Sequence, residues 1–368
     1  MKVAYDHQIF TSQEYGGISR YFVEVLQELS RITDEVDTRI VAPFYRNHYI
    51  QQSNVKTLSV SNFKIPVIPR TGRILSLVNS LLSPVIARSF SPDIVHETYY
   101  STRRNGLHGK KTVVTVHDMI HELFPDRFPH KDLTSKAKNI AVARADHVIC
   151  VSENTRRDLV EIFDVDESKT SVVKHGFTSM SCSEQVSIDF PRPFILYVGS
   201  RAGYKNFDGL LEAYASQSPI TKNYDLIAFG GGEFTKNEVA RFEELEIPSD
   251  KVRNVLGSDE ILAAYYKAAT LFVYPSLYEG FGIPPLEAMS FGCPVVASNT
   301  SSIPEVVGDA GAFFDPYSTE SISRTIEGVL SDTQVASSLK QRGFERIEHF
   351  SWEKCAHDTL KVYEKVLG

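Results

Sequence analysis

Residues 271–289 read Leu-Phe-Val-Tyr-Pro-Ser-Leu-Tyr-Glu-Gly-Phe-Gly-Ile-Pro-Pro-Leu-Glu-Ala-Met, and this stretch contains one complete strand–loop–helix unit. The apolar run 271–274 predicts a short buried strand. Pro284 suits the first turn of a helix, where its missing N–H costs nothing. Gly292 suits the end of that helix, and Pro294 prevents its continuation. The stretch therefore predicts a helix that begins directly after a glycine-containing loop.

The same alternation of strand and helix runs outward from this unit in both directions. The predicted strands are 2–5, 38–41, 93–96, 112–117, 147–151 and 171–174 in the first half, and 194–199, 224–229, 252–256, 271–274, 295–298 and 311–315 in the second. Such a βα rhythm predicts parallel sheets that helices cover on both faces. We therefore expect an α/β protein with two doubly wound, Rossmann-like domains that face a central cleft.

Domain bounds follow from chain length and from one break in the rhythm. The chain has 368 residues, which favours two domains over one. Residues 179–192 are polar and lack periodicity, and prolines mark their end, as is typical of a linker. The predicted domains are residues 1–185 and 190–351, and a last helix at about 352–368 is expected to pack on the first domain.

Composition narrows the class of protein. Apolar residues make up 42% of the chain and charged residues 23%, as in a globular protein, and the net charge of −7 argues against general nucleic-acid binding. The charge is uneven, at about +2 over residues 1–185 and about −9 over the rest, so the halves are expected to have different partners. The N-terminus has no apolar signal core, and the four cysteines lack metal or redox spacing. We expect a reducing, cytoplasmic location.

The strongest candidate site lies in the opening stretch. The backbone N–H groups of Phe281, Gly282 and Ile283 would form an anion site at the start of a helix. The carboxylates of Glu279 and Glu287 can accept hydroxyl hydrogen bonds, which suits polyols such as a sugar and a ribose. The alternative interpretation is a loop–helix junction with incidental glutamates.

Two further loops follow predicted strands. Gly199 begins a loop in which Arg201 and Lys205 place two cations at a strand–helix junction, suited to a diphosphate. A solvated basic loop is the alternative. Gly16 and Gly17 separate the first strand from the first helix, where backbone N–H groups could approach an anion. They do not form the dinucleotide fingerprint, so NAD is not expected.

Histidine provides the fourth candidate. His117 ends a strand and could face a cleft and bind a sugar hydroxyl, with a buried structural histidine as the alternative. His96, at the end of another strand, is ambiguous in the same way. No cluster of side chains has metal-ligand spacing. Arg201, Lys205 and helix dipoles could replace a metal at a diphosphate, so neither a metal nor a cofactor is expected.

These sites, in this order, resemble the retaining glycosyltransferase family 4, whose fold is GT-B. The most specific part of this resemblance is the Glu-x7-Glu motif from Glu279 to Glu287, which contains Gly-Phe-Gly. The runs at 294–298 and 303–311 also look like that family. The opening residues 5–21 are similar to bacterial members that build cell-surface polysaccharides, many of them mannosyltransferases.

The resemblance implies a role for each candidate. Those roles are donor-sugar contact for Glu279 and His117, ribose binding for Glu287, diphosphate neutralisation for Arg201 and Lys205, phosphate contact for Gly16, Gly17, Gly199, Phe281, Gly282 and Ile283, and a place near the base for Gly257. It also implies independence from metals. Transfer would retain the anomeric configuration on one face of the sugar, with the leaving phosphate helping to deprotonate the acceptor.

The predicted function is transfer of a hexose, with mannose favoured, from a GDP- or UDP-linked sugar to a growing cell-surface polysaccharide or lipid-linked oligosaccharide. The alternatives are a non-catalytic sugar-nucleotide-binding partner of a transferase and a sugar-nucleotide epimerase. A phosphorylase ranks lower, because that class usually has a much longer chain with a pyridoxal-phosphate lysine. A glycoside hydrolase is also less favoured. That class needs two carboxylates that flank one bond, whereas Glu287 is expected to face the ribose.

Residues 74–86 place their apolar side chains on one helical face, and serines and an asparagine make the run too polar for a membrane span. The surrounding segment 64–111 carries a net charge of about +6. Its basic residues are Lys64, Arg70, Arg73, Arg88, Arg103, Arg104, Lys110 and Lys111. Such a segment can dock on anionic lipid, so we expect peripheral contact with the inner membrane or a lipid-diphosphate acceptor. A core helix with solvated ends is the alternative.

Overall fold

The computed structural model describes residues 1–53, 55–56, 63–66, 71–104, 106–181, 188, 190–201, 203–216 and 218–368. Within these ranges only the backbone is described for residues 63, 73, 218, 219 and 221. Arg70 and the side chain of Arg73, both in the predicted basic segment, lie outside the described residues. The same holds for residues 182–187 and 189 of the predicted linker.

The chain divides into two compact units. One unit comprises Met1–Gly176 together with Phe350–Gly368, and the other comprises Phe177–His349. Each has a six-stranded sheet in which every pair of neighbouring strands is parallel. Two short strands, β3 (Phe44–Tyr45) and β4 (Phe63–Lys64), pair separately in the first unit.

The sheet of the first unit has the order β2-β1-β5-β6-β7-β8. Its strands are β1 (Lys2–Tyr5), β2 (Asp37–Ile40), β5 (Ile94–Glu97), β6 (Lys111–Val116), β7 (His147–Cys150) and β8 (Thr170–Val172). Its helices are α1 (Gln8–Ser12), α2 (Gly17–Ile32), α3 (Tyr49–Gln52), α4 (Gly72–Ala87), α5 (Ile120–Leu123), α6 (Thr134–Arg144), α7 (Glu153–Phe163) and α16 (Trp352–Leu367), with 3-10 turns η1 (Pro125–Arg127) and η2 (Glu167–Lys169). Every residue of β5 and β7 is buried, as expected for strands between two helical layers.

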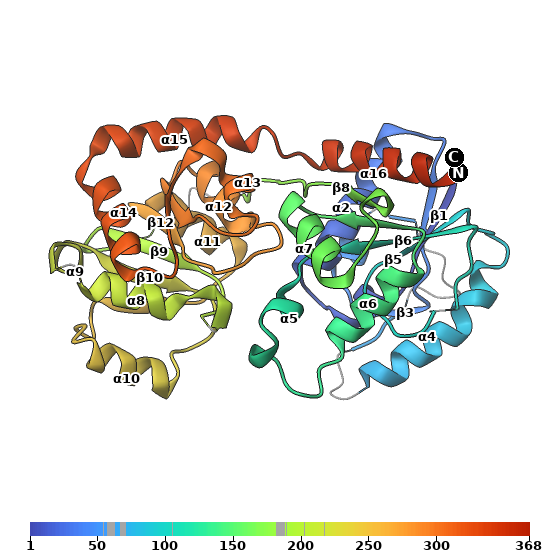
Figure 1. Cartoon of the computed structure of the whole chain (residues 1–368), viewed down its shortest axis with the longest axis horizontal. Helices are drawn as coiled ribbons and strands as arrows, with labels where there is room; N and C mark the ends of the chain where they lie inside the picture. Colours follow the sequence, from blue (N-terminus) through green and yellow to red (C-terminus); the bar gives the residue numbers. More distant parts are fainter. Residues whose placement is uncertain are drawn as a thin grey trace. The chain divides into compact units, whose positions relative to one another are not determined.

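The last helix belongs to this first unit. Figure 1 shows α16 alongside α2, and the two helices are in contact. Beneath them the Tyr363 hydroxyl lies 2.5 Å from that of Tyr5 and 2.6 Å from Nδ1 of His96. The other ring nitrogen of His96 lies 2.8 Å from the Thr115 hydroxyl. His96 is therefore a satisfied core histidine, which decides the ambiguity left by the sequence.

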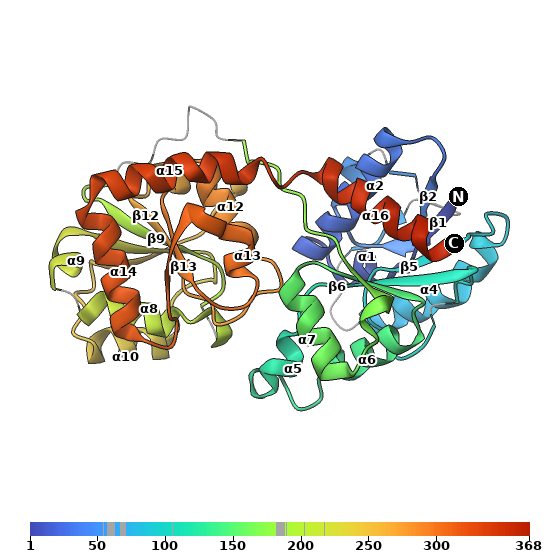
Figure 2. The same ribbon diagram turned by 45° about the horizontal axis from the view of Figure 1, so that its top comes forward.

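The sheet of the second unit has the order β11-β10-β9-β12-β13-β14. Its strands are β9 (Phe194–Val198), β10 (Asp225–Phe229), β11 (Val252–Val255), β12 (Leu271–Tyr274), β13 (Val295–Ser298) and β14 (Gly311–Phe314). Its helices are α8 (Phe207–Ser216), α9 (Ser218–Asn223), α10 (Lys236–Glu244), α11 (Asp259–Ala268), α12 (Ile283–Ser290), α13 (Ile303–Val307), α14 (Thr319–Ser331) and α15 (Thr333–Ile347), with 3-10 turns η3 (Gly203–Lys205) and η4 (Gly308–Ala310). Figure 2 shows α15 beside α12, which it contacts.

Strand order reverses once in each sheet. In the first unit β1 lies between β2 and β5, and in the second β9 lies between β10 and β12. Ligands of doubly wound sheets bind at such switch points, outside the carboxyl ends of the strands. The predicted α/β class with two doubly wound, Rossmann-like sheets is confirmed, and each predicted strand overlaps a strand of the structure.

Helix α4 exposes several large apolar side chains and buries a polar one. Ile74, Leu77, Leu81 and Val85 are each 59–73% exposed, whereas Asn79 on the opposite face is fully buried. The Asn79 amide accepts a hydrogen bond from the Phe44 backbone N–H and donates one to the Phe44 carbonyl. The buried face of α4 therefore mixes polar Asn79 and Ser83 with apolar Leu75 and Ala87, while a second apolar face lies outward. The alternative of an ordinary core helix is wrong for this outward face.

Buried histidines predict an acid-sensitive first unit. Burial lowers the pKa of His96 and of His175 to about 3, from an ordinary value of 6.5. Below pH 6.5 the unfolded chain binds protons that these folded residues do not, so stability falls as pH falls. At pH 5.5 each of these two histidines should lower the free energy of unfolding of the first unit by about 1 kcal/mol.

Hydrogen exchange at pH 7.5 and pH 5.5 would measure this effect as opening free energies in each unit. The second unit contains one histidine, His349, and serves as the internal control. Equal losses in both units would contradict the assignment to buried histidines.

Candidate active site

Two loops meet at the switch point of the second unit. Residues 199–206 follow β9 and residues 275–282 follow the neighbouring strand β12. The backbone N–H of Leu277 donates to the carbonyl of Tyr204 over 2.7 Å. The Lys205 ammonium donates to Oε1 of Glu279, also over 2.7 Å. Adjacent parallel strands thus bring together two predicted residues that lie 74 positions apart in the sequence.

The ion pair is largely shielded from solvent. The side chains of Lys205 and Glu279 are 18% and 10% exposed, and the Lys205 ammonium lies 5.8 Å from the centre of the Tyr274 ring. Burial, and then the nearby Glu279 carboxylate, raise the pKa of Tyr274 well above its ordinary value. The Tyr274 hydroxyl therefore stays protonated beside this pair.

Two serines in the loop after β13 form hydrogen bonds that fix the backbone of Glu279. Its N–H donates to the Ser301 hydroxyl over 3.0 Å, and its carbonyl accepts from the Ser302 hydroxyl over 2.8 Å. Ser302 also donates to the carbonyl of Phe281 over 2.9 Å. The loop that carries the Glu279 carboxylate is therefore held in place before any ligand arrives.

Helix α12 begins directly after this loop. Gly282 at its N-cap has a φ of 104°, a left-handed conformation that favours glycine. Phe281 and Gly282 are buried and Ile283 is half-buried. The start of a helix carries partial positive charge from its backbone N–H groups. Lys205 and the α12 terminus therefore contribute positive potential at the same end of the sheet.

Glu287 and Gly257 lie further along this region. Glu287 is in the second turn of α12 and accepts a hydrogen bond of 3.0 Å from the Tyr266 hydroxyl of α11. Gly257 is exposed, directly before Ser258, the N-cap residue of α11. A Cβ on Gly257 would lie 2.8 Å from Cβ of Ile261, so larger residues do not fit without movement.

Arg201 has contacts that the sequence did not predict. Its guanidinium donates to Glu238 over 2.6 Å, to the Gly230 carbonyl over 2.7 Å and to the Glu233 carbonyl over 2.9 Å. The side chain is only 3% exposed, and it lies 4.7 Å from the centre of the Phe234 ring. Arg201 thus holds the loop after β10.

The loop after β10 contains three successive glycines. Gly230, Gly231 and Gly232 all have positive φ values of 72–91°. A Cβ on Gly231 would lie 2.7 Å from Nη1 of Arg201, so the guanidinium occupies the space that a side chain would need. Gly199, with a φ of 132°, meets the same loop, because its N–H donates to the Phe229 carbonyl over 3.0 Å.

The remaining predicted residues lie in the first unit. His117 follows β6 and is 7% exposed, and among the described residues neither ring nitrogen has a hydrogen-bond partner. Burial lowers its pKa well below 6.5, with smaller contributions from His175, His96 and Lys138. A neutral imidazole can donate from one nitrogen and accept at the other.

Gly16 and Gly17 lie at the start of α2. Gly17 has open space where a Cβ would be, whereas a Cβ on Gly16 would collide with the side chain of Gln13. Oε1 of Gln13 accepts from the Ser19 N–H over 3.2 Å. Part of the predicted anion site at α2 is therefore occupied by a side chain of the protein itself. Across the described part of the chain, no group of three or more His, Cys, Asp or Glu could hold a metal ion.

Comparison with known proteins defines the family. The model described as Glycosyltransferase Family 4 matches residues 15–178, and the model described as Glycosyl transferases group 1 matches residues 183–346. The chain is 32% identical to O-antigen chain mannosyltransferase B of Escherichia coli over 69% of this chain and 70% of that one. The chain belongs to glycosyltransferase family 4. It is a hexosyltransferase, as predicted.

Other relatives of this glycosyltransferase are similar over different lengths. It is 29% identical to the serotype-specific mannosyltransferase WbdA of Escherichia coli over 70% of this chain, and it spans about a third of that relative, 34%. Sucrose-phosphate synthase of Thermosynechococcus elongatus has a TM-score of 0.76 at 20% identity over 99% and 98% of the two chains. Anabaena Alr3699/HepE, solved with UDP and glucose, has a TM-score of 0.70 at 17% identity over 99% of each. The structural neighbours confirm the GT-B fold.

Replacement of Arg201 should destabilise the second unit. Arg201→Ala removes the donor to the Glu233 carbonyl and one of the donors to the Glu238 carboxylate and to the Gly230 carbonyl, which should lower the free energy of unfolding by about 1–3 kcal/mol. Arg241→Ala is the matched control, because half-buried Arg241 also pairs with carboxylates, but those of Asp208 and Glu244 are 65% and 68% exposed. It should cost less than about 1 kcal/mol.

Urea unfolding of both variants would measure the difference. Equal stability of Arg201→Ala and wild type would show that the Arg201 network does not hold this loop.

Proposed function

We propose that this glycosyltransferase moves a hexose, with mannose favoured, from a GDP- or UDP-linked sugar to a growing cell-surface polysaccharide or a lipid-linked oligosaccharide. The observation that carries the proposal is the shielded Lys205–Glu279 pair at the switch point of the second unit. The preference for mannose and for a polysaccharide acceptor is supported by the O-antigen and serotype mannosyltransferases among the relatives. A nucleotide-linked donor is supported by the UDP complex among the structural neighbours.

In this proposal the diphosphate binds between Lys205 and the start of α12. An ammonium has three N–H donors, so Lys205 can contact a phosphate while it keeps its bond to Glu279. The N–H groups of Phe281, Gly282 and Ile283 add to the positive potential. Arg201 supplies the second positive charge and shapes the glycine turn beside Gly199.

The carboxylates then recognise the hydroxyl groups of the donor. Glu279, fixed through its backbone, accepts from the transferred sugar, and Glu287 accepts from the ribose. Tyr266 donates to Oε2 of Glu287 over 3.0 Å, which orients the carboxylate. Gly257, with no side chain, lets the base approach the end of β11. These roles are supported by positions along one edge of the sheet.

Transfer with retention follows from the resemblance to the family. The bond between the sugar and the diphosphate breaks as the acceptor oxygen attacks from the same face, and the acceptor proton passes to the leaving phosphate oxygen. Lys205 stabilises the charge that develops on the leaving group, which is an electrostatic contribution. For residues of the first unit, the resemblance assigns the donor sugar to neutral His117 and the donor phosphates to Gly16 and Gly17 at the start of α2.

Turnover should depend on both members of the ion pair. Glu279→Gln keeps the shape but removes the charge, and Lys205→Ala removes the ammonium. Each should lower kcat by at least about 100-fold, because the lost interaction stabilises charge in the transition state. Glu233→Gln, at an exposed position of the neighbouring loop, is the control and should keep wild-type activity.

The assay would follow release of nucleoside diphosphate from GDP-mannose and from UDP-sugars with mannoside acceptors. Wild-type turnover by either folded variant would show that its residue has been misassigned.

We also propose that α4 docks on an anionic membrane surface that carries the acceptor. Apolar residues line its exposed face and no acidic residue occurs in the helix. Arg88, Arg103 and Arg104 are exposed nearby, and Gly106 packs against Ser80 and Pro84 of α4. Basic residues that flank an apolar face complement anionic lipid. In the parts of the chain described here, no helix is long and apolar enough to span a bilayer.

Vesicle flotation would test this surface. Wild type should float with vesicles that contain phosphatidylglycerol and much less with phosphatidylcholine alone. Leu81→Glu with Val85→Glu should abolish flotation, because the charges oppose burial in lipid. Val239→Glu, at an exposed apolar site of α10, is the control and should float normally. Equal binding to both vesicle types, or none, would contradict the proposal.

A further inference from the structure

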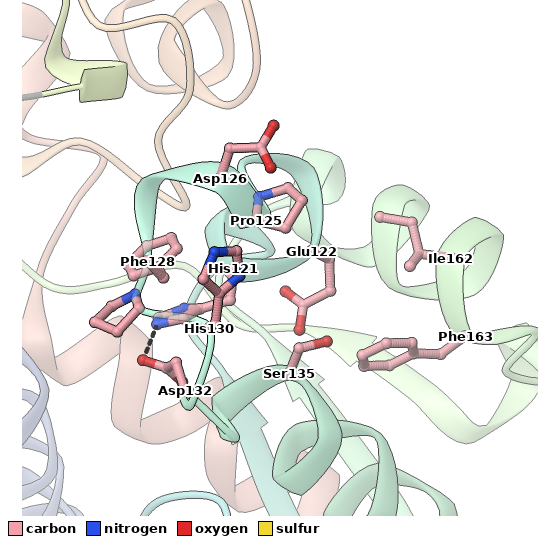
Figure 3. A pocket seen from close by; sticks show the side chains of 11 residues that line it. His121, Glu122, Pro125, Asp126, Phe128, His130, Asp132, Ser135, Ile162 and Phe163 are labelled. Carbon is pink, nitrogen blue, oxygen red and sulfur yellow. Dashed lines mark ion pairs between the residues drawn. The ribbon is translucent and has the colours of Figure 1, made fainter.

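The first unit contains a pocket that none of the assigned roles uses. It has a volume of about 430 Å³, within the range of roughly 300–1,000 Å³ for small-molecule sites. Its wall comes from α5, η1, the start of α6 and the end of α7 (Figure 3). It lies just beyond His117 and Asp118 in the chain, after β6, and strand ends of this kind bind ligands in doubly wound sheets.

The most informative group in this pocket is the carboxylate of Glu122. Its side chain is 2% exposed, and Oε2 accepts from the Lys138 ammonium over 2.7 Å. Among the described residues, Oε1 has no hydrogen-bond partner. In Figure 3 the Glu122 carboxylate points toward Ser135, inside the ring of lining residues. A buried carboxylate oxygen without a donor is costly, and a ligand hydroxyl would satisfy it.

Lys138 links this carboxylate to the end of β6. The ammonium is 1% exposed and donates to the Asp118 carbonyl over 2.8 Å as well as to Glu122. Its charge is thus neutralised inside the protein, and Glu122 is held in a fixed orientation. The pocket is therefore coupled through one buried side chain to the residue that follows His117.

His121 supplies a second group with unused hydrogen-bonding capacity. Its Nδ1 is buried and lacks a partner in the described residues, while Nε2 lies 3.8 Å from Asp132. The imidazole stacks on Phe128 with ring centres 3.9 Å apart. Asp132 is itself fixed, because it accepts from the Thr134 N–H over 2.7 Å. Donor and acceptor atoms therefore line the same cavity in fixed positions.

The chemistry of the lining selects among ligand classes. Three carboxylates, those of Glu122, Asp126 and Asp132, would repel a phosphate. A metal is not favoured, since none of the described residues forms a suitable group of ligands. Sugar hydroxyls both donate and accept, and the C–H faces of a sugar ring can pack on the rings of Phe128 and Phe163.

We propose that this pocket binds a neutral glycosyl unit of the acceptor, with Glu122 and His121 contacting its hydroxyl groups. The inference rests on the proposed transferase function and adds the acceptor-side site that the donor residues leave undefined. Glu122 and His121 are assigned to binding, while the reacting groups remain those at the switch-point loops.

Saturation-transfer NMR would test the pocket without any turnover. The probes are methyl α-mannoside, methyl α-glucoside and methyl α-galactoside. Ser135→Phe fills the pocket from α6 and leaves Glu122 and Lys138 unsubstituted, and Lys136→Phe at the adjacent exposed position is the matched control. At least one glycoside should bind wild type and Lys136→Phe, and its signal should be lost in Ser135→Phe.

Kinetics with the same glycoside as acceptor supplies the second measurement. Ser135→Phe and Glu122→Gln should raise the acceptor KM at least about tenfold, with the donor KM and donor hydrolysis unchanged. Binding of every glycoside equally to Ser135→Phe, or of none to wild type, would overturn the inference. Glycoside binding without turnover of any sugar nucleotide would instead refute the proposed function and leave the pocket assignment intact.

Discussion

The reversal of strand order between β9 and β12 is the constraint on which the candidate active site depends. It places two loops side by side that are far apart in the sequence, and the Lys205–Glu279 bond joins them. The pair serves two purposes in this account. It neutralises a shielded carboxylate before the donor binds, and it keeps an ammonium at the place where a diphosphate would need one. Because the Glu279 backbone is held by Ser301 and Ser302, little reorganisation would be required on binding.

The two units share one architecture but differ in the hydrogen bonding of their candidate site residues. In the second unit, Lys205 and Arg201 at the carboxyl end of β9 donate to carboxylates, Lys205 to Glu279 and Arg201 to Glu238. In the first unit, His117 and Glu122 retain buried polar atoms without protein partners among the described residues. The charged donor-side groups Lys205, Glu279 and Arg201 are thus paired within the protein, whereas His117 and Glu122 keep hydrogen-bonding capacity that ligands could use. The outward apolar face of α4 is likewise a surface whose partner lies outside the unit.

Much of the fold could be predicted from the sequence, because its signals are local. Each apolar run that predicted a strand of a six-stranded sheet overlaps one, and the glycine–proline pattern located the start of α12. For the candidate site, sequence spacing placed Glu279 and Glu287 on one loop–helix unit, as in the structure, while their roles stay predictions. The partners of Arg201 were not, because Glu238 is 37 residues away and comes close only after β9 pairs with β10. His96 and His117 looked alike, since only tertiary contacts separate a satisfied imidazole from an unsatisfied one. The orientation of α4 could not be predicted either, because it too depends on tertiary contacts.

We propose that the switch-point loops of the second unit hold a nucleoside diphosphate against Lys205. Isothermal titration calorimetry of the wild-type protein with GDP, UDP and ADP tests it most directly. We expect GDP or UDP to bind, and Lys205→Ala to weaken that binding by at least about tenfold. Absence of binding by all three nucleotides, or unchanged affinity in Lys205→Ala, would contradict it.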